Sequence, residues 1–291
     1  MDGDTVGLSK GGSFIGHHIM VPKEGVAIHI NAFNFPVWGM LEKIAVNLLA
    51  GVPAIVKPAT VTSYLTEAVT KEIIASGILP EGSLQLICGS ARGILDHATF
   101  QDVVTFTGSA STGKMLKGNP RILEESVPFN MEADSLNCMV LGQDAVPGTD
   151  EFNIFIKEVR KEITVKAGQK CTAVRRIIVP ENMVEDVQIA LGKILGETTV
   201  GDPRAEGVKM GPLAGISQRS DVKKNLDLLL QESEVVYGFP DKETDSKGAF
   251  MSPILLLNSD PFKKLSTHHI EVFGPVSTLL PYKNLDEAIE L

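Results

Sequence analysis

Short apolar runs alternate with amphipathic runs along most of the chain. Residues 25–30 form an apolar run of strand length, and residues 36–50 follow with apolar side chains at the three- and four-residue spacing of a helix. Gly51 then supplies a residue type that commonly ends helices. The Gly- and Ser-rich residues 1–14 are expected to form a loop. In the rest of the first half, the pattern predicts strands at 53–56, 84–88, 103–106 and 127–131, and helices at 63–76, 94–100 and from 112.

The same alternation returns in the second half. It predicts strands at 138–141, 176–179, 254–257 and 276–280, and helices at 151–165, 183–195 and 217–232. Near-continuous apolar strands that alternate with helices are typical of a parallel sheet covered on both faces, so the expected fold class is α/β. A chain of 291 residues suggests two domains, and a new unit begins at about Asp134. In such sheets, ligands bind at the carboxyl ends of the strands.

Composition narrows the possible partners. The formal net charge is −9 and no dense Lys/Arg patch with interleaved aromatic residues is present, so we expect no nucleic-acid partner. Cys88, Cys138 and Cys171 are widely spaced and odd in number, which favours a reducing cytoplasm over a disulfide framework. No secretory signal and no apolar run of about 18 residues is visible, so we expect no membrane association. Because His17 and His18 lack further ligands at suitable spacing, we expect no metal site.

A single cysteine stands between a helical run and a strand-like run. Cys171 lies in the sequence AGQKCTA at residues 167–173. A cysteine attacks carbon as its thiolate, which a helix end and nearby backbone N–H groups could stabilise. Alternatively, Cys171 is a small buried apolar residue, as most free cysteines are. The cysteine alone favours this second interpretation, and its neighbours along the chain decide against it.

Two polar residues follow the first two predicted strands. Asn34 stands just before Pro36, which suits the first turn of a helix. The Asn34 carboxamide could donate an N–H to a developing oxyanion, or it could cap the helix. Lys57 ends the second strand, from which its ammonium group could reach ribose hydroxyls or a phosphate. The alternative is an ordinary solvated lysine.

Three further motifs also have functional and structural interpretations. Gly108 and Ser109 link a strand to a helix, where glycine permits close backbone approach and the helix N-terminus favours phosphate. The loop lacks the G-x-G-x-x-G pattern and could be a common turn. Glu132 ends an apolar strand, as either a general base or a solvated carboxylate. Glu271 and Phe273, two residues apart, could face one ligand or belong to a strand and turn.

Taken together and in this order, these motifs resemble the NAD(P)-dependent aldehyde dehydrogenase superfamily. Each is weak alone, but the ordered set is very specific. The resemblance implies two Rossmann-like parallel α/β domains, a cofactor-binding domain at 1–134 and a catalytic domain at 135–291, with the active site in the cleft between them. The matching elements are Asn34-Phe35-Pro36, Lys57-Pro58, Phe106-Thr107-Gly108-Ser109 with Gly113, Glu132, Gly168-Gln169-Lys170-Cys171, and Glu271 with Phe273-Gly274-Pro275.

The resemblance is to one particular group of this superfamily at residues 30–41, 131–138 and 166–179. These stretches look like the aldehyde dehydrogenase part of bifunctional phenylacetate-degradation enzymes, which oxidises 3-oxo-5,6-dehydrosuberyl-CoA semialdehyde. The semialdehyde dehydrogenase of benzoyl-CoA oxidation is the alternative. Either implies an aldehyde substrate linked to CoA and oxidised to a carboxylic acid. Nothing in the chain corresponds to the hot-dog domain that hydrolyses oxepin-CoA, so we expect no ring opening.

The resemblance also implies catalytic roles. Cys171 would attack the aldehyde to give a thiohemiacetal and then a thioester. The Asn34 side chain and the Cys171 backbone N–H would hold the oxyanion, and Glu132 would activate water. Family members that pass the acyl group to CoA usually lack this glutamate, so we expect a free acid as product.

Cofactor roles follow from the same resemblance. Lys57, Thr60, Gly108 and Ser109 would contact the nucleotide, while Glu271 would bind the nicotinamide ribose and Phe273 would pack beside it. NAD-preferring relatives often carry a glutamate at the position of Thr60. A small neutral residue leaves space for a 2′-phosphate, with Lys57 nearby, so we expect NADP, with NAD possible.

Some features depart from the family pattern. Ala133-Asp134-Ser135 replaces the two glycines that usually follow the glutamate. The family's N-terminal segment and its C-terminal remainder, including the strand that builds the usual homo-oligomer, have no counterpart, so we expect a fragment. A truncated remnant without catalysis is therefore a second hypothesis, and a cysteine hydrolase or acyltransferase a third. The sequence fixes neither the aldehyde nor the oligomeric state.

Overall fold

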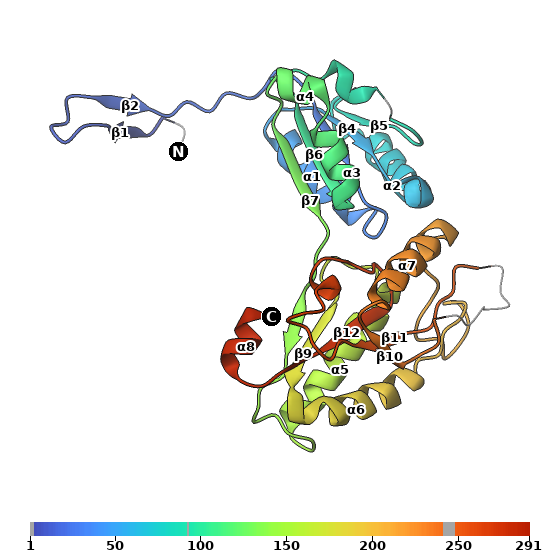
Figure 1. Cartoon of the computed structure of the whole chain (residues 1–291). Coiled ribbons are helices and arrows are strands. Elements are labelled where there is room, and N and C mark those ends of the chain that lie inside the picture. Colours follow the sequence, from blue (N-terminus) through green and yellow to red (C-terminus); the bar gives the residue numbers. More distant parts are fainter. Residues whose placement is uncertain (1–2, 92, 241–247) are drawn as a thin grey trace. The chain divides into compact units, whose positions relative to one another are not determined.

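The computed structural model describes residues 3–91, 93–240 and 248–291. The chain forms two compact units, Met1–Ala133 and Asp134–Leu291, which are described separately (Figure 1). In both units a sheet is flanked by helices, as the sequence pattern predicts. The roles assigned to the two domains stay predictions.

The first unit is built on a fully parallel sheet with the order β5-β4-β3-β6-β7. From β3 the chain adds strands outward to β5, then returns to place β6 on the other side of β3. The strand order therefore reverses between β3 and β6, and ligands of open α/β sheets bind outside such a reversal. The strands are β3 (Ala27–Ile30), β4 (Ala54–Lys57), β5 (Leu84–Leu86), β6 (Val103–Gly108) and β7 (Phe129–Ala133).

Helices cover both faces of this sheet. One buried cluster joins Met40 and Ile44 of α1 to Val56 of β4, and the other joins Val104 of β6 to Ile122 of α4. Helix α2 packs on the first cluster through half-buried apolar residues, and α3 on the second. The helices are α1 (Trp38–Leu49), α2 (Ser63–Ala75), α3 (Ala110–Lys117) and α4 (Pro120–Glu124), with 3-10 turns η1 (Thr60–Thr62) and η2 (Ile94–His97).

The second unit has the sheet order β10-β11-β12-β9-β8. Four strands are parallel, whereas the edge strand β10 runs antiparallel to β11, a common arrangement in large sheets. The sequence pattern did not predict β10, because its side chains lie exposed or half-buried at the edge. The strands are β8 (Cys138–Val140), β9 (Arg176–Pro180), β10 (Glu234–Tyr237), β11 (Ile254–Leu257) and β12 (Val276–Tyr282).

Two buried clusters hold the second unit together. Helices α5 and α6 pack against Ile177 of β9 through Val159 and Leu191, and α7 packs against Leu256 of β11 through Leu226. The helices are α5 (Asp150–Thr164), α6 (Val184–Gly196), α7 (Ile216–Leu229) and α8 (Leu285–Glu290), with 3-10 turns η3 (Val165–Gly168), η4 (Glu181–Met183) and η5 (Ser266–His268).

Two sequence-based expectations are wrong in part. The predicted loop at residues 1–14 contains β1 (Thr5–Gly7), which pairs antiparallel with β2 (Ile15–His17) because hydrogen bonds between the strands outweigh the Gly/Ser composition around them. The predicted helix at 94–100 is only the short 3-10 turn η2, which Gly93 in a left-handed conformation precedes. Among the described residues, no helix combines the length and apolar character that crossing a membrane requires.

Candidate active site

The candidate residues of the first unit follow the carboxyl ends of its strands. Asn34 follows β3, Lys57 ends β4, Ser109 follows β6 and Glu132 is the penultimate residue of β7. Because the strands are parallel and paired in register, these positions share one edge of the sheet. The reversal in strand order between β3 and β6 lies at the same edge.

The loop between β6 and α3 is tightly packed. A Cβ atom on Gly108 would come within 2.7 Å of the Phe106 ring, and one on Gly113 would collide with the Met131 side chain. Ser109 is the N-cap of α3, and its Oγ accepts the Thr112 backbone N–H at 3.4 Å. The glycines thus let the first turn of α3 lie close to the sheet, with its positive end at the carboxyl edge.

The structure bears on one of the two interpretations of Asn34, that of a helix cap. The N-cap of α1 is Val37, so Asn34 does not cap this helix. Asn34 is half-buried in the loop between β3 and α1. The catalytic role of its carboxamide stays a prediction.

Lys57 and Thr60 lie in the connection that leads to α2. Burial lowers the pKa of Lys57, an effect that the neighbouring Cys88 opposes. The Lys57 Nζ donates to the Pro58 carbonyl at 2.9 Å. Thr60 is exposed at the start of η1. The half-buried ammonium group of Lys57 thus stands three residues before the small, accessible side chain of Thr60.

Glu132 belongs to a row of polar groups that the sequence analysis did not identify. Its Oε2 accepts from Thr107 Oγ1 at 3.5 Å, and the two residues face each other across β6 and β7. Lys43 of α1 donates to Thr107 Oγ1 at 2.7 Å and to Asn31 Oδ1 at 2.9 Å. Burial lowers the pKa of Lys43, while Glu42 and then Glu132 oppose the shift. Glu132 itself is exposed.

The contacts of Lys43 with Thr107 and Asn31 could not have been predicted from motif spacing. Lys43 lies on α1, 64 residues before Thr107. The one available signal was a lysine on a mostly apolar helix, because burying an ammonium group requires acceptors.

In the second unit, Cys171 lies in a loop with unusual backbone geometry. Lys166, Ala167 and Gly168 are successive left-handed residues, with φ of 53°, 52° and 70°. Two of them carry side chains, for which this conformation is uncommon. The helix that precedes the loop, α5, ends at Thr164, so the helix end expected next to the cysteine is a C-terminus, which does not favour an anion.

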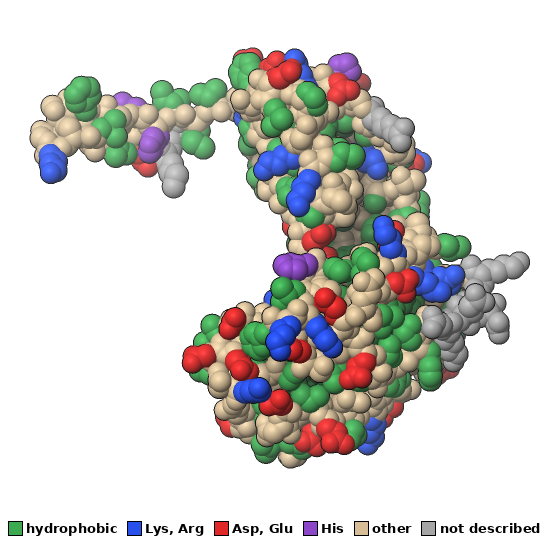
Figure 2. Space-filling view, viewed as in Figure 1, with side chains coloured by type: hydrophobic (Ala, Val, Ile, Leu, Met, Phe, Trp, Pro, Cys, Tyr) green, Lys and Arg blue, Asp and Glu red, His purple; other side chains and the backbone are tan. Residues whose placement is uncertain are grey.

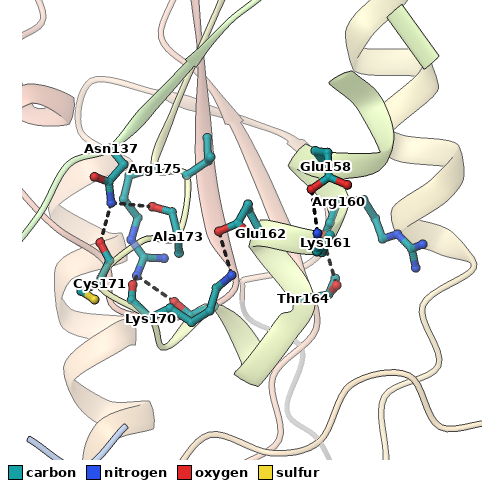
Figure 3. A network of polar contacts seen from close by, with 12 residues as sticks. Asn137, Glu158, Arg160, Lys161, Glu162, Thr164, Lys170, Cys171, Ala173 and Arg175 are labelled. Carbon is teal, nitrogen blue, oxygen red and sulfur yellow. Dashed lines mark hydrogen bonds and ion pairs between the residues drawn. The ribbon is translucent and has the colours of Figure 1, made fainter. Parts of the chain in front are cut away.

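Side chains fix the backbone on both sides of Cys171. The Cys171 carbonyl accepts from the Ser135 hydroxyl. It also accepts from the Asn137 amide, which donates to the Ala173 carbonyl at 3.4 Å as well (Figure 3). Lys170 pairs with Glu162 of α5 at 2.7 Å, and both side chains are largely buried. The cysteine side chain is half-buried. The loop is thus held by hydrogen bonds to its carbonyl groups and by the Lys170–Glu162 ion pair, none of which uses the Cys171 thiol.

The structure brings Glu271 and Phe273 to the same loop. A Cβ atom on Gly168 would collide with the Gly274 carbonyl, so the two segments touch through their backbones. The Glu271 carboxylate meets Arg175 at 3.4 Å, and its other oxygen accepts the Ser135 N–H at 3.3 Å. Burial raises the pKa of Glu271, and Arg175 opposes the shift. Arg175, Ser135 and Asn137 were missed because isolated polar residues carry no motif.

Acidic and basic side chains are interspersed on the face shown in Figure 2. Among the described residues, no group of three or more His, Cys, Asp or Glu side chains could hold a metal ion.

Known proteins resemble this chain over its whole length. A model described as the aldehyde dehydrogenase family matches residues 2–291. A 3,4-dehydroadipyl-CoA semialdehyde dehydrogenase of Aromatoleum evansii is 44% identical over 295 residues, which cover all of this chain and 57% of that protein.

Solved structures show the same fold. A succinic semialdehyde dehydrogenase of Streptococcus pyogenes in complex with NADP+ has a TM-score of 0.82 at 23% identity, covering 92% of this chain and 57% of that one. A betaine aldehyde dehydrogenase of Staphylococcus aureus in complex with NAD+ has a TM-score of 0.81 at 24% identity, covering 91% and 52%. The chain thus spans little more than half the length of these proteins.

Proposed function

Since the chain belongs to the aldehyde dehydrogenase family, we propose that it oxidises an aldehyde to a carboxylic acid with a nicotinamide cofactor and Cys171 as the nucleophile. The observation that carries the proposal is the direct contact between the Cys171 loop and the segment containing Glu271 and Phe273. A buried structural cysteine would not require a strained loop built against a second polar segment. The match to the aldehyde dehydrogenase family argues against a cysteine hydrolase.

The proposed mechanism assigns one task to each group of this chain. The Cys171 thiolate attacks the aldehyde carbon, and the Asn34 amide and the Cys171 backbone N–H hold the oxyanion of the thiohemiacetal. Such donors contribute about 3–4 kcal/mol each where they have been tested. A nicotinamide cofactor, when bound, would supply the hydride acceptor that this oxidation requires. Glu132 then takes a proton from the water that attacks the resulting thioester, which releases the acid and returns the thiol.

Residues of the first unit suit a dinucleotide. The N-terminus of α3 and its Ser109 cap stand at the carboxyl edge beside the reversal in strand order, where phosphates of such ligands bind. The exposed Thr60 and the half-buried Lys57 suit a 2′-phosphate, so we propose NADP as the preferred cofactor. Glu271 and Phe273 are proposed to hold the nicotinamide ribose.

The proposed substrate is a CoA-linked semialdehyde of aromatic catabolism. Its support is the 44% identity to the 3,4-dehydroadipyl-CoA semialdehyde dehydrogenase over the full chain. The corresponding semialdehyde of phenylacetate breakdown, 3-oxo-5,6-dehydrosuberyl-CoA semialdehyde, is the other candidate. CoA would serve as a handle on the substrate, because Glu132 favours water as the acyl acceptor. A cytoplasmic location fits this proposal.

The test follows formation of the reduced cofactor. A medium-chain aldehyde and a CoA-linked semialdehyde are each offered with NADP and NAD in parallel. We expect absorbance at 340 nm to rise faster with NADP, and Cys171→Ala to reduce the rate by at least about a thousandfold. Cys138→Ala is the matched control, because Cys138 is exposed and lies in the same unit.

Two outcomes would overturn parts of the proposal. Turnover that survives in Cys171→Ala would exclude this residue as the nucleophile. Cofactor binding without any turnover, measured by fluorescence titration of the unsubstituted chain, would replace the proposed oxidation with binding alone.

A further inference from the structure

One guanidinium group in the second unit contacts both the loop that carries Cys171 and the segment that contains Glu271 and Phe273. Arg175 is 5% exposed and immediately precedes β9. Its Nη1 donates to the Gly274 carbonyl at 2.8 Å, and its Nη2 donates to the Gly168 carbonyl at 2.7 Å and to the Lys170 carbonyl at 3.4 Å. Arginine carries five N–H donors in a rigid fork, so one side chain can satisfy carbonyls of two segments at once.

The fourth contact of Arg175 is electrostatic. Its Nε lies 3.4 Å from Glu271 Oε1, and the two side chains are 4% and 9% exposed. The guanidinium carbon also lies 5.4 Å from the centre of the Phe273 ring. The long Nε–Oε1 distance leaves acceptor capacity on the carboxylate, which a ribose hydroxyl could use.

We propose that Arg175 is a positioning residue that locks the Cys171 loop to the Glu271–Gly274 segment and keeps the Glu271 carboxylate charged and oriented. The inference rests on the proposed function, because it gives Cys171 and Glu271 their catalytic and cofactor-binding roles. Three carbonyl contacts fix the backbone on either side of the contact between Gly168 and Gly274. The charge offsets the cost of burying Glu271, a carboxylate that burial otherwise drives toward its neutral form.

Lysine could not replace Arg175 in this arrangement. An ammonium group concentrates its donors at one point, whereas the carbonyls of Gly168 and Gly274 are reached from different nitrogens of the fork. Arg175→Lys therefore retains the charge near Glu271 and loses the bridge between the segments. Arg175→Met removes both. The two variants separate orientation of the loop from ionisation of the carboxylate.

The first experiment is a double-mutant cycle on the unfolding equilibrium. Arg175→Met leaves Glu271 buried without its partner, and Glu271→Gln removes the charge that needs one. We expect Arg175→Met to raise the unfolding constant at least about tenfold more in the Glu271 background than in the Gln background. The matched control cycle uses Arg121 and Glu125, an accessible pair in the first unit whose coupling should be small.

The second experiment measures the rate at which iodoacetamide alkylates Cys171, in a background with the two exposed cysteines replaced by Ala. At equal folded fraction, we expect Arg175→Lys and Arg175→Met to change the rate by more than about threefold, and Arg121→Met to leave it unchanged. Fluorescence titration with NADP should show weaker binding in Arg175→Met than in Arg175→Lys, because only the former leaves Glu271 without a neighbouring cation.

These readouts separate failure of this inference from failure of the proposed function. Additive effects in the Arg175/Glu271 cycle, or an alkylation rate that neither Arg175 variant changes, would overturn the positioning role even in an active enzyme. Strong coupling together with altered alkylation supports the role whether or not the unsubstituted chain turns over. If Arg175→Met does not fold, the cycle is run with Arg175→Gln, which also removes the charge, and the same criteria apply.

Discussion

At the scale of single residues, Thr60 is the proposed determinant of cofactor preference. Thr60 is exposed, so a larger side chain does not disturb the core of the first unit. We predict that Thr60→Glu lowers the affinity for NADP at least about tenfold and affects NAD much less, because a carboxylate would repel the 2′-phosphate and desolvated like charges cost about 1.4 kcal/mol or more. Fluorescence titration with both nucleotides measures the change.

Thr60→Gln separates charge from size in this prediction. It is nearly isosteric with the glutamate variant and neutral, so we expect it to keep most of the preference for NADP. Equal losses of NADP affinity in the Glu and Gln variants would mean that steric contact, and not charge, acts at this position.

At the scale of elements, the sequence predicts the regular parts of the fold well. The alternation of apolar strands and helices predicts the strands that adjoin the candidate residues. The predicted strand at 254–257, for example, coincides with β11. The pattern failed where an element is exposed, as in the β1–β2 hairpin and β10. Periodicity reports burial, and such strands are held by hydrogen bonds to a neighbour instead.

The candidate site likewise contains residues that the sequence predicts and residues that it does not. Motif order predicted Cys171, Glu271 and the loop after β6 as candidates, because each belongs to a recognisable local pattern. The supporting residues Arg175 and Lys43 act through contacts across many residues of sequence, such as the pairing of Arg175 with Gly274, 99 residues later. No local pattern encodes these contacts, so only the fold reveals them.

Gly168 provides the prediction at this scale. Its φ of +70° disfavours side chains, and a Cβ would also collide with the Gly274 carbonyl. We predict that Gly168→Ala costs at least about 2–3 kcal/mol of unfolding free energy, measured by urea denaturation, and abolishes turnover because the Cys171 loop must shift.

Gly207→Ala is the matched control for backbone strain. Gly207 has a φ of +78° but no described heavy atom within 4 Å of an added Cβ. Its cost should be about 1 kcal/mol, the backbone contribution alone. If both variants lose the same stability, the contact between Gly168 and Gly274 contributes nothing beyond backbone conformation.

At the scale of the whole molecule, the two units can be followed separately by spectroscopy. The chain has a single tryptophan, Trp38, at the start of α1 in the first unit. Its fluorescence therefore reports the first unit, while far-ultraviolet circular dichroism reports both. A two-unit chain need not unfold in one step, so the two signals need not coincide.

His29 makes the stability of the first unit depend on pH. Its side chain is 2% exposed in the central strand β3 and contacts Thr105 at 2.8 Å and Asn47 at 2.7 Å. Burial lowers the pKa of His29 from 6.5, and nearby Lys43 adds to the shift, whereas the Asn47 hydrogen bond opposes it. Below pH 6.5 the unfolded chain therefore binds a proton that the folded chain does not yet take up.

The stability that the neutral form contributes is thus complete above about pH 6.5 and falls as the pH is lowered toward the folded-state pKa. We predict that the unfolding free energy of the first unit, measured through Trp38 fluorescence in urea, decreases by up to about 1.4 kcal/mol per pH unit from this group between pH 6.5 and 5.5. In His29→Gln this part of the slope should disappear, whatever the variant's absolute stability. His18→Gln, which changes an exposed histidine, should retain it, and a slope unaltered by His29→Gln would mean that other groups govern the acid sensitivity of this unit.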